Sequence, residues 1–141
     1  MRRVSCKSAE IVVFDWDDGV NFSYPPLPTE LQKLFEAKIQ LVHDKGGDRC
    51  IGRKLYYLLY AAGWRNIEIK IVHDIWQGPS DRVKALRGTE LSLSEIRPQL
   101  VNNALITEDE FDLAMDQLRE YYCGDIFSVA MFFAGFAMNT R

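Results

Sequence analysis

Apolar residues recur with the period of strands in three parts of this chain. Residues 10–15 (EIVVFD) form a short β-branched and aromatic run that ends in an acid, which is typical of a buried strand with a polar carboxyl end. Isoleucines alternate with charged residues over positions 67–71, as in a half-buried strand. Residues 126–138 are apolar, and Gly135 with the many phenylalanines and valines favours a strand there. Three prolines within residues 20–28 predict an extended loop.

A helical period predicts two helices between the first two strands. Apolar positions follow one helical face over residues 31–42, where Thr29 and Gln32 match a capping box. A second helix is predicted over residues 51–62, with Asp48 as its candidate cap.

The region between the second and third strands is interrupted by helix breakers. Glycines and prolines break the pattern between residues 77 and 103, so short helices are predicted around residues 81–86 and 94–101. A last helix follows, and a capping box of Thr107 and Glu110 marks its start.

The order of these elements is strand, helix, helix, strand, short helices, helix, strand. It predicts an α/β fold in which helices flank a three-stranded sheet. The 141 residues are expected to form one domain, 1–141, because domains commonly contain about 100–150 residues. Residues 77–105 are interpreted as a helical insertion between the second and third strands.

Composition and charge exclude several classes of protein. With 48% hydrophobic residues, the chain is not intrinsically disordered. A net charge of -3 predicts no nucleic-acid partner and no attraction to an anionic membrane. No apolar run reaches the roughly 20 residues of a spanning helix. No targeting segment is visible, so we expect a cytoplasmic protein in which Arg2, Arg3 and Lys7 form a solvated terminus.

Cofactor and metal motifs are absent from the sequence. The three cysteines lie far apart without CxxC spacing, which predicts reduced thiols. His43 and His73 have no convergent ligands nearby, so no metal site is predicted. The glycines form neither a GxGxxG nor a GxxxxGK loop, and a nucleotide cofactor therefore has no visible cradle.

The acidic cluster of residues 15–19 (DWDDG) directly follows the first predicted strand. Ligand sites in open α/β sheets lie off the carboxyl ends of strands, so this cluster is the best-placed polar group in the chain. A calcium loop is excluded, because its fifth and twelfth positions would be glycine and proline. Two interpretations remain. Residues 12–17 resemble the opening motif of haloacid dehalogenase-like phosphatases, with Asp15 as nucleophile and Asp17 as general acid. Alternatively, the cluster is a polar strand exit whose aspartates cap a helix or face solvent.

A basic turn at residues 49–54 begins the second predicted helix. Free amides at a helix start attract anions, and Arg49 or Arg53 would strengthen that attraction. The alternative is that Arg53 forms a salt bridge, or covers apolar surface with its aliphatic stem.

Residues 52–69 resemble a segment of class I S-adenosylmethionine-dependent methyltransferases, in their small-molecule, ubiquinone/menaquinone-biosynthesis-like branch. There a helix reading GR.L..LL..AGF..V.V leads into the sixth strand, and this chain has Gly52-Arg53 at the start of that stretch and AAGW at its end. Residues 11–17 are similar to the family's fifth strand with its acidic exit. Residues 106–138 are similar to its last helix and seventh strand.

In that family the fifth, seventh and sixth strands are neighbours, and the seventh runs antiparallel between the other two. The resemblance therefore implies a partial Rossmann-like methyltransferase fold, with a three-stranded mixed sheet in the order first, third, second predicted strand. It covers only the carboxyl-terminal half of the family's domain.

The resemblance implies methyl transfer from S-adenosylmethionine to a small molecule. The family's glycine-rich loop and the acidic residue that bind this cofactor lie upstream of anything in this chain, so no cofactor-binding residue is transferred and the chain is expected to be inactive alone. The substrate-side positions implied are Asp15, Trp16, Asp17 and Arg53.

The missing half also implies an open sheet edge. If the strand of residues 11–15 has lost its usual neighbour, its edge amides and carbonyls are exposed, and we expect a homo-oligomer that covers them. A non-catalytic self-associating module and a phosphatase are the alternative functions.

Overall fold

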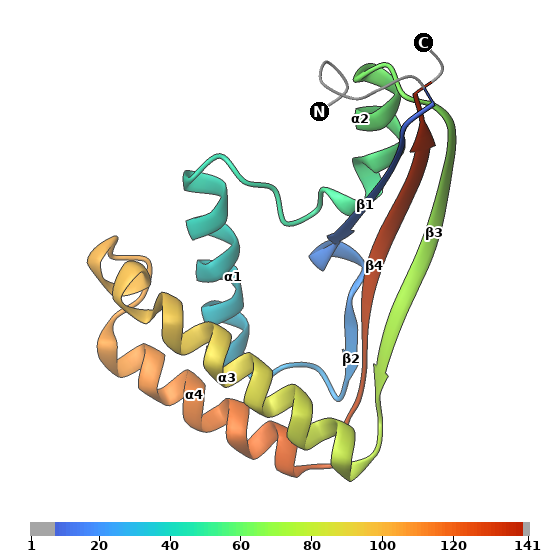
Figure 1. Ribbon diagram of the computed structural model, residues 1–141. Coiled ribbons are helices and arrows are strands. Elements are labelled where there is room, and N and C mark those ends of the chain that lie inside the picture. Colours follow the sequence, from blue (N-terminus) through green and yellow to red (C-terminus); the bar gives the residue numbers. More distant parts are fainter. Residues whose placement is uncertain (1–7, 140–141) are drawn as a thin grey trace. The chain divides into compact units, whose positions relative to one another are not determined.

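The computed structural model describes residues 8–139, which form strands and helices (Figure 1). The basic residues predicted to form a solvated terminus lie outside the described residues. In chain order the elements are β1 (Glu10–Trp16), the 3₁₀ turn η2 (Asp18–Val20), β2 (Phe22–Tyr24), α1 (Thr29–Asp44), the 3₁₀ turn η3 (Gly52–Lys54), α2 (Leu55–Ala61), β3 (Arg65–Trp76), α3 (Pro79–Asn102), α4 (Glu108–Cys123) and β4 (Phe127–Met138).

Contacts between residues divide the described chain into two compact units. The first unit contains residues 8–21, 49–74 and 130–139, and the second contains residues 22–48 and 75–129. β1, η3 and α2 belong to the first unit, whereas β2, α1, α3 and α4 belong to the second.

The sheet of the first unit has β4 as its middle strand. β1 pairs with β4 in antiparallel register, with Ile11 opposite Ala137 and Asp15 opposite Phe133. β3 also pairs with β4, and Figure 1 shows the two strands running in opposite directions. The predicted order of the first, third and second strands is therefore confirmed. The predicted mixed sheet is wrong, because every pairing among the described strands is antiparallel.

Helix α2 covers one face of this sheet. The packed side chains come from β1, α2, the turn after α2, β3 and β4, and they are Ile11, Val13, Leu59, Trp64, Ile67 and Ala137. Gly135 on β4 allows the helix to approach, because a Cβ there would lie 2.8 Å from Leu59 Cδ1.

The second unit is built on three amphipathic helices, α1, α3 and α4. Each presents one apolar stripe to a shared core. Its fully buried large side chains are Leu31, Leu34, Leu93, Leu100, Phe111 and Leu118. The predicted capping box at the start of α4 is confirmed, since Thr107 and Glu110 exchange both hydrogen bonds.

Two predicted helix caps are wrong. Helix α1 has Pro28 rather than Thr29 at its N-cap, and the proline side chain forms no capping hydrogen bond. Instead, Gln117 Oε1 of α4 accepts hydrogen bonds from the first amides of α1, at 3.2 and 3.3 Å. The second predicted helix begins as η3 and continues as α2, whose N-cap is Lys54 rather than Asp48. At α1 a tertiary contact replaces the predicted cap as the partner of the first backbone amides, and at α2 a 3₁₀ turn leads into the helix.

The predicted count of three strands is wrong, because the loop predicted over residues 20–28 contains a fourth. β2 ends at Tyr24, directly before the first proline, and pairs with the start of β4 through Phe22 opposite Val129. The predicted short helices are also a single helix of 24 residues, α3, which passes through Pro98. Among residues 8–139, no helix is both long enough and apolar enough to cross a membrane.

Candidate functional site

The candidate site lies where β1 ends, and it is built around two consecutive aspartates. Asp17 is the N-cap of η2, and its Oδ1 accepts a hydrogen bond of 3.1 Å from the Gly19 amide. This Asx turn takes the chain out of the strand, and β2 then continues in the same direction along β4. Each of the two aspartates forms an ion pair with an arginine. We call the four residues, Asp17, Asp18, Arg49 and Arg53, the aspartate–arginine clamp.

The first pair of the clamp joins a buried carboxylate to a half-exposed guanidinium. Arg53 donates from Nε to Asp17 Oδ2 at 2.7 Å and from Nη2 to Oδ1 at 2.5 Å, and its backbone amide adds a third bond of 3.0 Å. The Asp17 side chain is fully buried, whereas that of Arg53 is 47% exposed. The Arg53 side-chain hydrogen bonds lower the pKa of Asp17, and they outweigh the opposing effect of burial.

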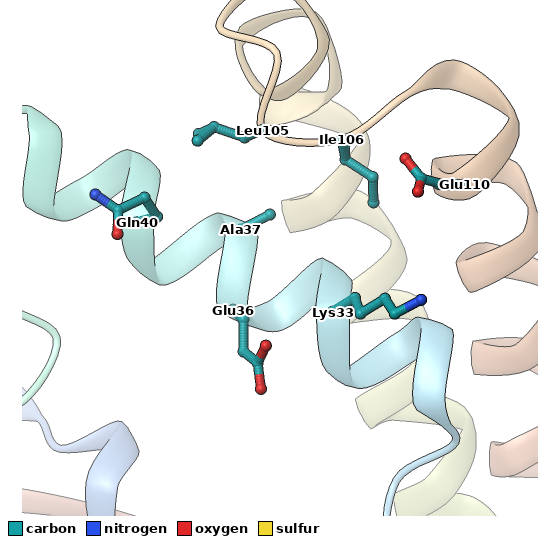
Figure 2. Close-up of a pocket in the computed structure, with 7 residues that line it drawn as sticks. All are labelled: Lys33, Glu36, Ala37, Gln40, Leu105, Ile106 and Glu110. Atoms are coloured by element: carbon teal, nitrogen blue, oxygen red, sulfur yellow. The ribbon is translucent and has the colours of Figure 1, made fainter.

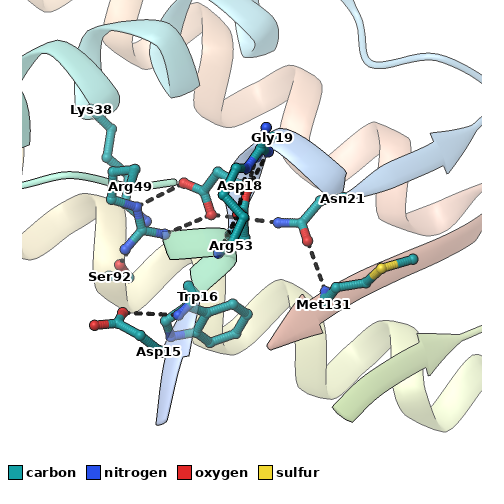
Figure 3. A network of polar contacts seen from close by, with 11 residues as sticks. Asp15, Trp16, Asp18, Gly19, Asn21, Lys38, Arg49, Arg53, Ser92 and Met131 are labelled. Atoms are coloured by element: carbon teal, nitrogen blue, oxygen red, sulfur yellow. Dashed lines mark hydrogen bonds and ion pairs between the residues drawn. The ribbon is translucent and has the colours of Figure 1, made fainter. Parts of the chain in front are cut away.

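The second pair repeats this geometry at the neighbouring position (Figure 3). Arg49 donates from Nε to Asp18 Oδ2 at 2.7 Å and from Nη2 to Oδ1 at 2.9 Å. The Asp18 amide in turn donates to the Arg49 carbonyl at 2.9 Å. Asn21 extends the network, because its side chain contacts Asp18 and accepts from the Met131 amide at 2.8 Å. The turn after β1 is thus tied both to β4 and to the segment that enters η3.

Two glycines make room for the clamp. A Cβ on Gly52 would lie 2.7 Å from Phe133 Cδ2 and 3.1 Å from Asp17 Cβ, so η3 approaches the strand exit only because this residue has no side chain. A Cβ on Gly19 would coincide with the Arg53 guanidinium, at 2.2 Å from Nη2. Both glycines are part of the site, although only Gly19 belongs to the acidic cluster predicted from the sequence.

The last two residues of β1 carry the remaining candidate side chains. Asp15 Oδ1 accepts a hydrogen bond of 2.8 Å from the Trp16 amide. The Trp16 ring packs on Phe132, with ring centroids 3.7 Å apart, and 36% of the residue stays exposed. Trp16 therefore offers a supported aromatic surface at the strand end, and the Asp15 carboxylate lies on the opposite face of the strand (Figure 3).

The structure brings together two of the four predicted substrate-side residues and places the others beside them. Asp17 and Arg53 form a salt bridge, which is one of the two interpretations that the sequence left open for Arg53. Asp15 and Trp16 lie next to them in β1. The pairing of Asp18 with Arg49 was not predicted.

This geometry does not suit Asp17 as a general acid of a phosphatase. A general acid must carry a proton at working pH, and the lowered pKa of Asp17 favours the ionised form. Its oxygens also accept four hydrogen bonds, from Arg53 and Gly19. Asp17 holds the turn in place instead.

The second unit contains a pocket of about 380 Å³ between α1 and the start of α4 (Figure 2). Its polar lining side chains are engaged in local pairs. Lys33 bonds to Glu30, Gln40 bonds to Asp44, and Glu110 completes the cap with Thr107. This pocket therefore offers a ligand few unsatisfied polar groups.

Among the described residues, no group of three or more His, Cys, Asp and Glu side chains is arranged to hold a metal ion. Comparison with protein-family models and with curated proteins finds no match to this chain.

Proposed function

We propose that this chain is the carboxyl-terminal half of a class I S-adenosylmethionine-dependent methyltransferase domain that acts on a small molecule. The observation that carries this proposal is the order of the strands in the first unit. β4 lies antiparallel between β1 and β3, which run in the same direction and are separated along the chain by α1, η3 and α2. The fifth, seventh and sixth strands of the resembling family have this arrangement, with the reversed strand in the middle.

The segment that carries the resemblance also has a physical role in the fold. Gly63 ends α2 with a φ of 86°, a left-handed conformation that glycine adopts without strain. The Trp64 amide then donates to the Leu59 carbonyl at 3.0 Å, and the Trp64 ring is buried against the sheet. This helix-to-strand turn thus uses a glycine followed by a large aromatic residue, which supports the proposed relation to the methyltransferase family.

The described residues do not fit the methyl donor itself. At the exit of β1, the Arg53 guanidinium fills the space beside Gly19 that the ribose of the donor would need. After β3, the chain enters α3 within two residues. We therefore propose that S-adenosylmethionine is held by a cofactor half outside this chain. Because such enzymes act mainly by aligning donor and acceptor, the chain alone is inactive.

In this proposal the four site residues have different roles. Asp17 and Arg53 position the strand exit. Asp15 and Trp16 remain available for the methyl acceptor on opposite faces of the strand end, with the Trp16 ring as a stacking surface and the Asp15 carboxylate as a hydrogen-bond acceptor. A non-catalytic, self-associating role is the second candidate, and the free edge of β1 described below favours it.

The coding sequence directly upstream of the Met1 codon, or in a neighbouring gene, tests the proposal. We expect it to encode a strand followed by a GxGxG loop. The longer chain, or the two chains together, should then transfer a labelled methyl group to a small-molecule acceptor, and a Trp16→Ala variant should raise the KM for that acceptor. Absence of any such coding sequence, or a longer chain that binds no methyl donor, would contradict the proposal.

A further inference from the structure

The outer edge of β1 carries backbone groups that no strand in the described chain pairs. Among the strands within residues 8–139, β1 pairs with β4 alone. The Asn139 amide donates to the Ala9 carbonyl, and the Asp17 amide donates to the Met131 carbonyl. Because alternate residues of a strand point to the same edge, the odd-numbered residues of β1 face β4. The even-numbered residues Glu10, Val12, Phe14 and Trp16 direct their amides and carbonyls outward.

The free part of this edge is short and has defined ends. At one end, the Trp16 amide already donates to Asp15 Oδ1. At the other end, Ser8 has a φ of 63°, which takes the backbone out of the extended conformation. The ladder available to a partner therefore consists of Glu10, Val12 and Phe14, which lie symmetrically about Val12.

The same residues expose apolar side chains on one face of the strand. Val12 is 62% exposed and Phe14 is 52% exposed, and only Glu10 adds a charge. Natural proteins usually cover such an edge or protect it with charges and prolines. The free ladder of β1 contains no proline, and its one charged residue, Glu10, lies at its end.

We propose that a second copy of this chain covers this edge, through antiparallel pairing of β1 with β1 about a two-fold axis at Val12. In this register Val12 faces Val12 of the second copy, and Glu10 faces Phe14. Each facing pair exchanges two hydrogen bonds, so all three outward amides of each copy are satisfied. A two-fold contact needs one self-complementary surface, and this ladder has that symmetry.

Charges also permit this register. No two carboxylates face each other, because Glu10 lies opposite Phe14 and Asp15 lies opposite Ala9. The pairing joins the apolar side chains of Val12 and Phe14 from both copies on one face of a continuous sheet.

This inference rests on the edge geometry and not on the proposed methyltransferase function. The two remain distinguishable, because the dimer is tested on the isolated chain without any methyl donor. A strand of a cofactor half placed at this edge would exclude the second copy, since one edge accepts one strand.

Sedimentation equilibrium of the full chain at tens of micromolar tests the proposal. We expect twice the monomer mass of 16.3 kDa. Val12→Pro removes an outward amide and leaves the β1–β4 hydrogen bonds intact, and proline is tolerated on an edge strand. It removes both hydrogen bonds at the axis, so the dimer dissociation constant should rise at least about tenfold. Val12→Thr keeps the amide and the β-branched shape, and it should change that constant much less.

A cysteine at the axis gives a second measurement that does not depend on the proline variant folding. Facing Cα atoms in a hydrogen-bonded antiparallel pair lie about 5.5 Å apart, which is within disulfide range. Val12→Cys should therefore form a linked dimer on oxidation, beyond any that the wild-type cysteines form. Leu113→Cys, at an exposed position of α4, should not. A monomeric wild-type chain overturns the proposal, as does a dimer that Val12→Pro leaves intact and Val12→Cys does not cross-link.

Discussion

Removal of the Arg53 guanidinium should destabilise the protein more than removal of an arginine from an exposed ion pair. Arg53→Met keeps the aliphatic stem and deletes two charge-assisted hydrogen bonds to the fully buried Asp17 carboxylate. Breaking a buried ion pair commonly costs about 3–5 kcal/mol. Here two backbone amides still bond to Asp17, and the half-exposed position of Arg53 admits water. Both features reduce the penalty, so we expect a loss of about 2–3 kcal/mol in the free energy of unfolding.

Urea denaturation followed by circular dichroism measures this loss. Arg119→Met is the matched control, because Arg119 pairs with Glu90 and Asp116 on the surface and its side chain is 53% exposed. Exposed pairs contribute about 0–1 kcal/mol, so the control should change the unfolding free energy little. If Arg53→Met destabilises no more than Arg119→Met, the clamp does not hold the strand exit.

Three further predictions follow from single contacts. Because the pKa of Asp17 is lowered on folding, its stabilisation is present above its unfolded pKa and is lost as pH falls through the folded pKa. Below about pH 5, unfolding free energy should therefore fall more steeply in wild type than in Arg53→Met, and parallel curves would refute this. Gly52→Ala should destabilise by about 1–3 kcal/mol through overpacking against Phe133, whereas Gly88→Ala, with open space in α3, should stabilise by up to about 1 kcal/mol in the same denaturation assay. Thr107→Ala removes the α4 cap and should cost about 1 kcal/mol, and an unchanged melting curve would contradict that role.

Periodicity predicted the long elements of the fold, and tertiary contacts decided the rest. The strands at residues 10–15, 67–71 and 126–138 all exist, because their apolar patterns match burial on a sheet. Helix α3 was not predicted as one element, since Pro98 and the glycines are local breakers. In the structure, the burial of Leu93 and Leu100 outweighs those local preferences.

The sequence predicted which residues belong to the candidate site, but it did not predict which aspartate pairs with which arginine. The position of Asp17 at a strand exit singled it out, and a salt bridge was one of the options for Arg53. Their contact joins residues 36 positions apart, which no local pattern encodes. Gly19 and Gly52 were the available signal, because a glycine beside each partner permits the close approach.

Titration with S-adenosylmethionine in a calorimeter tests the proposed methyltransferase half most directly. The isolated chain should show no binding, because in this proposal the cofactor half holds the donor. The same chain joined to its cofactor half should bind the donor at micromolar concentration. Micromolar binding by the isolated chain would contradict the proposal, as would failure of the completed protein to bind.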